Sequence, residues 1–232
     1  MNSQNNNKTQ KHTTGKISIK DKNLILDLDE TLVHTYNDYH NLDLLLDEYM
    51  SKKTRPYIVD APFIHNDEII NGRLWGSTRP HLDKFLRYCF KNFNQIIIWS
   101  AGTARYVKET VKHIFSRIRS PDYIFTRKDC LKVGDGVTKP IEHLAKNNPE
   151  LGLTLANTLI IDDQITNFDH NPKNGILIPE FTPPLFDQTK NKENFIKTHD
   201  SDNNLLKLMT WFDQSGIMKV DDVRKINKNN IF

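Results

Sequence analysis

Short runs of mostly apolar residues recur along this chain, and polar residues follow each run. Three of these runs cover residues 24–26, 96–99 and 158–161. A strand that is covered on both faces has such a continuous apolar run, whereas a strand with one face in water alternates apolar and polar residues. Residues 82–90 instead repeat their apolar side chains at helical spacing. The pattern predicts an α/β fold, in which helices cover both faces of a parallel sheet.

The same rhythm continues through the second half of the chain. We predict helices over residues 103–115, 141–146 and 202–212, and short strands over residues 123–125 and 176–178.

Residues 36–78 break this rhythm and predict an insertion. Short strands are expected over residues 56–58 and 73–76, around Asn71-Gly72, which is a hairpin signal. Residues 42–50 can form a short helix. An insertion at this point would sit over the polar residues that follow the first run, as a flap or a lid that selects substrate.

The two ends of the chain differ from its middle. Residues 1–18 contain almost no apolar side chain, so we predict a disordered tail. Residues 19–212 are expected to form one domain, and residues 213–232 a polar C-terminal tail that frays. We expect no further module of the BRCT type after Phe212.

Composition narrows the class of protein only slightly. A net charge of +3 and a pI near 8.7 fit an anionic substrate but do not indicate direct binding to nucleic acid. Cys89 and Cys130 are too few for a disulfide framework, so both are expected to be reduced thiols. Neither a membrane span nor a signal peptide is evident. We expect a soluble, monomeric, intracellular protein of the nucleus or cytoplasm.

Asp27, Asp29 and Thr31 occupy alternate positions directly after the first apolar run. Open α/β sheets bind their ligands beyond the carboxyl ends of the strands. Two neighbouring carboxylates repel each other unless a cation or a proton lies between them, and Mg²⁺ meets that need with few protein ligands. Asp27 could then attack phosphorus as a nucleophile. The alternative is that these residues form only a polar turn.

Other polar residues follow the later strands. Ser100 can donate to a phosphate oxygen, or it can simply cap the next helix. Lys139 precedes a helix and can neutralise the charge of a phosphate and a nucleophile, although a single lysine is more often a surface residue. Asp162 and Asp163 form a second carboxylate pair at a strand end. Two such pairs on parallel strands of one sheet are hard to explain as turns.

Five segments, in this order, carry a family resemblance: D-L-D-E-T-L-V-H (27–34), R-P-H-L-D-K-F-L (79–86), I-I-I-W-S-A-G-T-A-R-Y (96–106), T-K-P-I-E-H-L (138–144) and L-I-I-D-D-Q-I-T-N-F (159–168). The chain resembles the haloacid dehalogenase (HAD) superfamily of phosphotransferases. Within it, the chain resembles the FCP/SCP-type, or NLI-interacting-factor-like, phosphatases, which act on the phosphorylated C-terminal domain (CTD) of RNA polymerase II. The resemblance implies a HAD-like Rossmannoid sheet with a small hairpin-type insertion after the first motif.

The resemblance also implies catalytic roles. Asp27 matches the nucleophile that forms an aspartyl-phosphate, and Asp29 matches the general acid/base. Ser100 matches a hydroxyl that binds phosphate, and Lys139 matches a lysine that neutralises charge. Asp162 matches an acidic residue that orients the site.

Further residues are implied in metal and substrate binding. The Mg²⁺ ligands implied by the resemblance are Asp27, Asp29 through its backbone carbonyl, and Asp163. The substrate-binding residues are Thr31, Tyr106 and Arg127. In the insertion, four apolar side chains could line a peptide groove or could form a small core of their own: Tyr57, Ile58, Phe63 and Trp75.

The function expected from these residues is Mg²⁺-dependent removal of phosphate from serine or threonine of a phosphoprotein, through an aspartyl-phosphate. The CTD of RNA polymerase II is a candidate substrate and partner. Two alternatives remain open. One keeps the chemistry but acts on a small metabolite or on a phosphate end of a nucleic acid. The other is an inactive phosphopeptide-binding or scaffold protein on the same fold.

Overall fold

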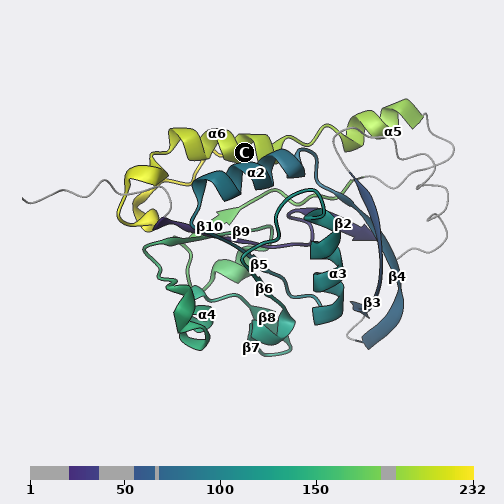
Figure 1. Cartoon of the computed structure of the whole chain (residues 1–232), viewed down its shortest axis with the longest axis horizontal. Coiled ribbons are helices and arrows are strands. Elements are labelled where there is room, and N and C mark those ends of the chain that lie inside the picture. Colours follow the sequence, from purple (N-terminus) through teal and green to yellow (C-terminus); the bar gives the residue numbers. More distant parts are fainter. Residues whose placement is uncertain (1–20, 37–54, 66–67, 184–191) are drawn as a thin grey trace, which may run out of the picture.

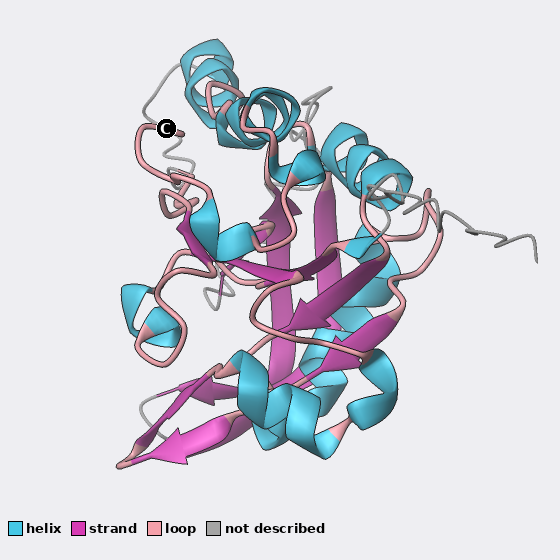
Figure 2. Cartoon of the chain, turned by 90° about the vertical axis from the view of Figure 1, so that its left-hand side faces the viewer, coloured by secondary structure: helices cyan, strands magenta, loops and turns pink. Residues whose placement is uncertain are grey.

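The computed structural model describes residues 21–36, 55–65, 68–183 and 192–232. The tail predicted over residues 1–18 and the short helix predicted over residues 42–50 lie outside these ranges. Figure 2, which is turned by 90° from Figure 1, shows helices on both sides of the strands.

A five-stranded sheet forms the centre of the molecule, and every neighbouring pair of its strands is parallel (Figure 1). In the order β10-β9-β1-β5-β6, the strands are β10 (Gly175–Leu177), β9 (Thr158–Asp162), β1 (Asn23–Leu26), β5 (Gln95–Trp99) and β6 (Tyr123–Phe125). Every residue of β1 is buried. This double cover explains the unbroken apolar run in the sequence.

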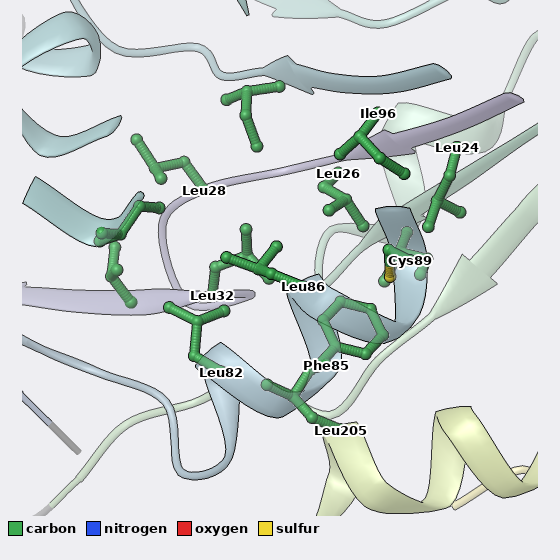
Figure 3. Close-up of a cluster of buried hydrophobic side chains, with 14 of the residues drawn as sticks. Leu24, Leu26, Leu28, Leu32, Leu82, Phe85, Leu86, Cys89, Ile96 and Leu205 are labelled. Carbon is green, nitrogen blue, oxygen red and sulfur yellow. The ribbon is translucent and has the colours of Figure 1, made fainter. Parts of the chain in front are cut away.

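Alternate residues of β1 face opposite sides of the sheet. The helices that cover it are α2 (Leu82–Asn92), α3 (Ala104–Ile114), α4 (Ile141–Asn147) and α6 (Asn204–Gln214). Leu24 and Leu26 share one apolar cluster with α2, α3 and α6, and Figure 3 shows Phe85, Leu86 and Leu205 beside them. Ile25 belongs to a second cluster, which contains α4. The prediction of an α/β fold with helices on both faces is therefore confirmed.

The insertion forms a second, antiparallel sheet in the order β2-β4-β3. Its strands are β2 (Val33–Tyr36), β3 (Pro56–His65) and β4 (Glu68–Thr78). Along β3, Tyr57, Val59 and Ala61 are buried, while Ile58 and Asp60 are exposed. The buried face of β3 packs against α3, so the inserted sheet lies against the main domain.

The turn of the inserted hairpin was predicted wrongly. β3 and β4 pair continuously from Pro56 and Ser77 to His65 and Glu68, so the two strands remain paired well beyond Asn71-Gly72. The dipeptide Asn71-Gly72 instead pairs with Ala61-Pro62 inside the ladder. The reason is that burial of one face of β3 and the cross-strand pairs outweigh the local preference of Asn-Gly for a turn.

The C-terminal residues also differ from the prediction of a fraying tail. They form two 3₁₀ turns, η5 (Ile217–Lys219) and η6 (Val223–Lys225). Ile217 and Val223 are fully buried and Ile231 is nearly so, all within the α2–α3–α6 cluster. These apolar residues are single and widely spaced, so no helical or strand period predicted their burial.

Two further elements had no counterpart in the prediction. A short hairpin of β7 (Leu131–Val133) and β8 (Gly136–Thr138) comes directly before Lys139. Helix α5 (Lys192–His199) precedes α6.

Candidate active site

The polar residues that follow the central strands meet at one edge of the sheet. β1 lies between β5 and β9, and Leu26 is in register with Ile98 and Ile161. The next residue, Asp27, continues the ladder, because its backbone N–H donates to the carbonyl of Ile161 at 2.9 Å. Ser100 follows β5 directly and Asp162 ends β9. Residues that are far apart in the sequence therefore converge around Asp27.

Lys139 is buried between two of these carboxylates. Its ammonium group donates to Asp27 and, at 2.7 Å, to Oδ2 of Asp162. Burial alone would favour the neutral amine, but the two carboxylates outweigh it and hold the pKa of Lys139 above its usual value. Burial raises the pKa of Asp27 well above 3.8, although Lys139 opposes this shift. Lys139, beyond the short hairpin, thus faces the predicted nucleophile.

Three hydrogen bonds that the sequence did not predict hold the carboxylate of Asp162 in place. The side-chain amide of Asn167 donates to both of its oxygens at 2.9 Å, and the backbone N–H of Gln164 donates to Oδ1 at 2.9 Å. Asn167 lies on the 3₁₀ turn η4 (Ile165–Phe168) directly after β9. The sequence analysis quoted this motif but gave Asn167 no role. In the sequence, the only feature that points to Asn167 is an amide side chain four residues after the acidic pair Asp162-Asp163.

Oxygens of three carboxylates, those of Asp27, Asp162 and Asp163, lie within 4.8 Å of one another and could hold a metal ion. Carboxylate oxygens are the donors that Mg²⁺ prefers, and Mg²⁺ needs few of them because it keeps several waters. The predicted ligand set had Asp29, through its backbone, where this cluster has Asp162. Asp163 is less buried than the other two, and its burial still raises its pKa above 3.8.

Thr31 contacts one carboxylate of this cluster. Its side chain is fully buried, and its hydroxyl donates to Oδ1 of Asp163 at 3.2 Å. Thr31 thus supports a carboxylate of the acidic cluster, and its predicted role in substrate binding stays a prediction.

Asp29 contacts a hydroxyl on α3 and a hydroxyl that follows β5. Tyr106 donates a hydrogen bond to its Oδ1, and Ser100 donates a long one, of 3.4 Å, to its Oδ2. Burial raises the pKa of Asp29 from 3.8 to about 6, while these two hydroxyls oppose the shift. A carboxyl group with a pKa near 6 can release and accept a proton close to neutral pH.

A cavity of about 510 Å³ opens beside Asp29. The inserted sheet contributes Thr35, Tyr36 and Leu74 to its wall, and the main domain contributes Tyr106 and Arg127. The inserted sheet therefore forms one wall of the cavity beside Asp29, and its role as a lid stays a prediction.

The insertion's aromatic residues are placed differently from the predicted groove. Tyr57 and Trp75 are buried, and the ring of Trp75 stacks on Tyr36 at 3.9 Å between centroids. Ile58 is exposed on the face opposite Tyr57, and the side chain of Phe63 lies outside the described part of the structure. Tyr57 belongs to the apolar cluster that the inserted sheet shares with α2, α3 and α6, whereas Trp75 packs on Tyr36 within the inserted sheet. Neither the predicted groove nor a separate core of the insertion therefore describes all four side chains.

The sequence pattern of a known family, described as NLI interacting factor-like phosphatase, matches residues 22–224. The chain belongs to this family. A curated member, "Probable C-terminal domain small phosphatase" of Dictyostelium discoideum, is 27% identical over 213 residues, which are 90% of this chain and 56% of the relative. The chain therefore spans just over half the length of this family relative.

Solved structures of Fcp1, an essential RNA polymerase II CTD phosphatase, share the fold of this family member. One matches with a TM-score of 0.57 and 18% identity, over 88% of this chain and 69% of the other. A second, the fission yeast Fcp1 bound to beryllium fluoride, matches with a TM-score of 0.53, 17% identity and the same coverage. The likeness confirms the predicted HAD-like fold. Within the described ranges, no helix is both long and apolar enough to cross a membrane.

Proposed function

We propose that the protein is a Mg²⁺-dependent phosphatase that removes phosphate from serine or threonine of phosphoproteins, with Asp27 as its nucleophile. The observation that supports this most is the position of Asp27. Its carboxylate lies at the carboxyl end of the central strand, contacts the buried Lys139 and belongs to the cluster of acidic oxygens. Bound Mg²⁺ would supply positive charge that shields the carboxylates and polarises a phosphoryl oxygen.

The proposed reaction has two steps. Asp27 attacks phosphorus and forms an aspartyl-phosphate, while Asp29 gives its proton to the departing seryl or threonyl oxygen. Asp29 then takes a proton from water, which attacks the aspartyl-phosphate and releases inorganic phosphate. Lys139 and the hydroxyl of Ser100 stabilise negative charge on the phosphoryl oxygens in both steps.

The cavity supports a peptide substrate. Leu74 and Tyr36 provide apolar surface on one wall, and Arg127 provides a cation beside Asp29. A phosphorylated peptide can fill such a cavity with side chains next to the phosphoresidue, whereas a small polar metabolite would leave it empty. The named relatives are CTD phosphatases, so a peptide from the CTD of RNA polymerase II is the first candidate substrate and partner.

The first test asks whether Asp27 carries phosphate. The wild type should hydrolyse a phosphoserine peptide and an aryl phosphate, lose both activities in excess chelator and regain them with Mg²⁺. The variant Asp27→Asn should be inactive and should retain no acid-stable radioactive phosphate from a labelled peptide after rapid quenching. Phosphate bound covalently to Asp27→Asn would overturn the proposed nucleophile.

The same assays separate the role of Asp29. Asp29→Asn should slow the first step on phosphoserine much more than on the aryl phosphate, whose leaving group needs little protonation. Equal losses of that step on both substrates would argue against Asp29 as the acid. A wild type that prefers sugar phosphates or nucleotides to every phosphopeptide would refute the protein substrate but keep the chemistry.

A further inference from the structure

Three hydroxyl groups from three different elements lead away from Asp29. The hydroxyl of Tyr106, on α3, donates to Oδ1 of Asp29, and Oγ1 of Thr35, on β2, lies 2.7 Å from the Tyr106 oxygen. The hydroxyl of Tyr57, on β3, contacts the same oxygen of Thr35 at 2.5 Å. Tyr57 is 1% exposed and Tyr106 is 5% exposed, so water competes little for these hydrogen bonds. These linked hydroxyls, called the hydroxyl chain below, connect the candidate general acid to the inserted sheet.

The direction of these hydrogen bonds follows from the number of protons. Each hydroxyl carries a single proton, and Tyr106 gives its proton to Asp29. The Tyr106 oxygen must then accept from Thr35, and the Thr35 oxygen must accept from Tyr57. Hydrogen bonds aligned in one direction polarise and strengthen one another. The three linked hydroxyls fix Oδ1 of Asp29, whereas Oδ2 accepts the long hydrogen bond from Ser100.

Two glycines leave the space that both tyrosine rings occupy. Gly76 lies between Thr35 and Tyr57 in the inserted sheet, where it is in register with both. A Cβ atom at Gly76 would lie 2.6 Å from the hydroxyl oxygen of Tyr57, so only glycine lets that ring cross to Thr35. A Cβ atom at Gly102 would lie 2.8 Å from the ring of Tyr106. The backbone is thus built to accommodate the chain of hydroxyls.

We propose that Tyr106 is a positioning residue, which acts with Thr35 and Tyr57 to hold the carboxyl group of Asp29 in one orientation and to tie it to the inserted sheet. This inference rests on the proposed function, in which Asp29 is the general acid and base. It differs from the role in substrate binding that the sequence implied for Tyr106. A group that only orients an acid should affect turnover more than substrate affinity.

The kinetic test removes one hydroxyl at a time. Tyr106→Phe should lower kcat on a phosphoserine peptide about tenfold while KM stays within about twofold, because the ring and its packing remain. The first step on an aryl phosphate should lose much less. Tyr57→Phe should give the same pattern with a smaller loss. The matched control is Tyr88→Phe, which removes a tyrosine hydroxyl that donates to Asp213 at 2.6 Å outside the site and should change neither constant.

Two kinetic outcomes would overturn the proposal. If Tyr106→Phe raises KM and leaves kcat unchanged, its hydroxyl contacts substrate and does not position Asp29. If Tyr106→Phe slows the first step equally on phosphoserine and on the aryl phosphate, the hydroxyl does not act through the proton donor.

A measurement without turnover separates this inference from the proposed function. If the wild type hydrolyses neither substrate, the phosphatase proposal fails, but proton NMR of the hydroxyl groups still tests the chain. Removal of the Tyr57 hydroxyl should shift the hydroxyl resonance that disappears in Tyr106→Phe, whereas Tyr88→Phe should leave it in place. An unshifted resonance in Tyr57→Phe would show that the hydroxyls are not connected.

Discussion

Lys139 holds together two carboxylates that would repel each other in a buried site. Its ammonium group contacts Asp27 and Asp162, and all three side chains are at least nine-tenths buried. Removal of one partner from a buried ion pair costs far more than the pair contributes, because the remaining charge is left without compensation. Lys139 should therefore matter for folding as well as for catalysis.

Replacement of Lys139 by Met tests this expectation. We expect Lys139→Met to be inactive and, in the presence of a chelator, to lose about 3 kcal/mol of unfolding free energy, measured by urea denaturation. Addition of Asp27→Asn to that variant should restore part of the loss, because only one buried carboxylate then lacks a partner. Lys146→Met, at an exposed position of α4, is the control. If Lys139→Met alone were as stable as the wild type, the ammonium group would not be needed to balance the two buried carboxylates.

Sequence reasoning found the residues whose position depends only on a strand end. Asp27, Ser100 and Asp162 each stand where an apolar run stops, and the parallel order of β9, β1 and β5 brings them together. It did not find Asn167, or the link from Thr35 to Tyr57. These partners depend on the direction of a turn or on strand register, which a local pattern of apolar residues does not encode.

At the scale of elements, the inserted sheet is the part that the sequence described least well. The main strands have unbroken apolar runs, so their burial in the fold agrees with the local sequence pattern. In the insertion they disagree, because Asn71-Gly72 favours a turn while the pairing with β3 extends beyond it. Gly76, where an added Cβ would meet a backbone oxygen and the Tyr57 ring, sits inside β4 and not at a turn.

Gly76→Ala tests how tightly this sheet is packed. The added Cβ would lie 2.4 Å from the carbonyl oxygen of His34 and 2.6 Å from the Tyr57 ring. We expect a loss of about 2 kcal/mol in the free energy of unfolding, as overpacking forces both strands to move. Gly136→Ala, where the nearest atom of another residue would lie at 3.7 Å, should cost less in the same urea titration. Equal losses of unfolding free energy in the two variants would mean that the inserted sheet can shift to make room for the added methyl group.

At the scale of the whole molecule, buried polar groups join segments that the central sheet does not. The guanidinium of Arg79 is fully buried and donates to the carbonyls of Thr31, at 3.1 Å, and Pro179, at 2.6 Å, and to the carboxylate of Asp202. It thereby ties the loop after Asp29 to the segment before α6. From sequence, Arg79 was only the residue before a helix.

His199 makes a similar connection at the end of α5. Its Nε2 lies 3.1 Å from the hydroxyl of Ser77 on β4, and its ring packs edge-on against Phe181 at 5.7 Å. Burial lowers the pKa of His199 from 6.5 to about 4, although the neighbouring carboxylate of Asp200 opposes the shift. The folded protein therefore keeps this imidazole neutral at a pH where the unfolded chain already protonates it.

The sign of the pH dependence follows from that difference. The contribution of His199 to stability is complete above pH 6.5 and is lost as the pH falls towards 4, because the unfolded chain binds the extra proton first. Between pH 7 and pH 5 this loss should be about 2 kcal/mol. Asp27 and Asp29 act in the opposite direction, because their raised pKa values make protonation favour the folded state. The effect of His199 must therefore be read from a variant and not from the wild type alone.

His199→Gln isolates this effect, because glutamine can still bond to Ser77 but cannot take up a proton in this range. Urea denaturation at pH 7, 6 and 5 should show that the variant loses about 2 kcal/mol less than the wild type on acidification. His170→Gln, at an exposed position, should follow the wild type. If the free energy of unfolding fell equally with pH in His199→Gln and in the wild type, the imidazole between α5 and β4 would protonate without a cost in stability. A neutral histidine would then not be what holds α5 to the inserted sheet.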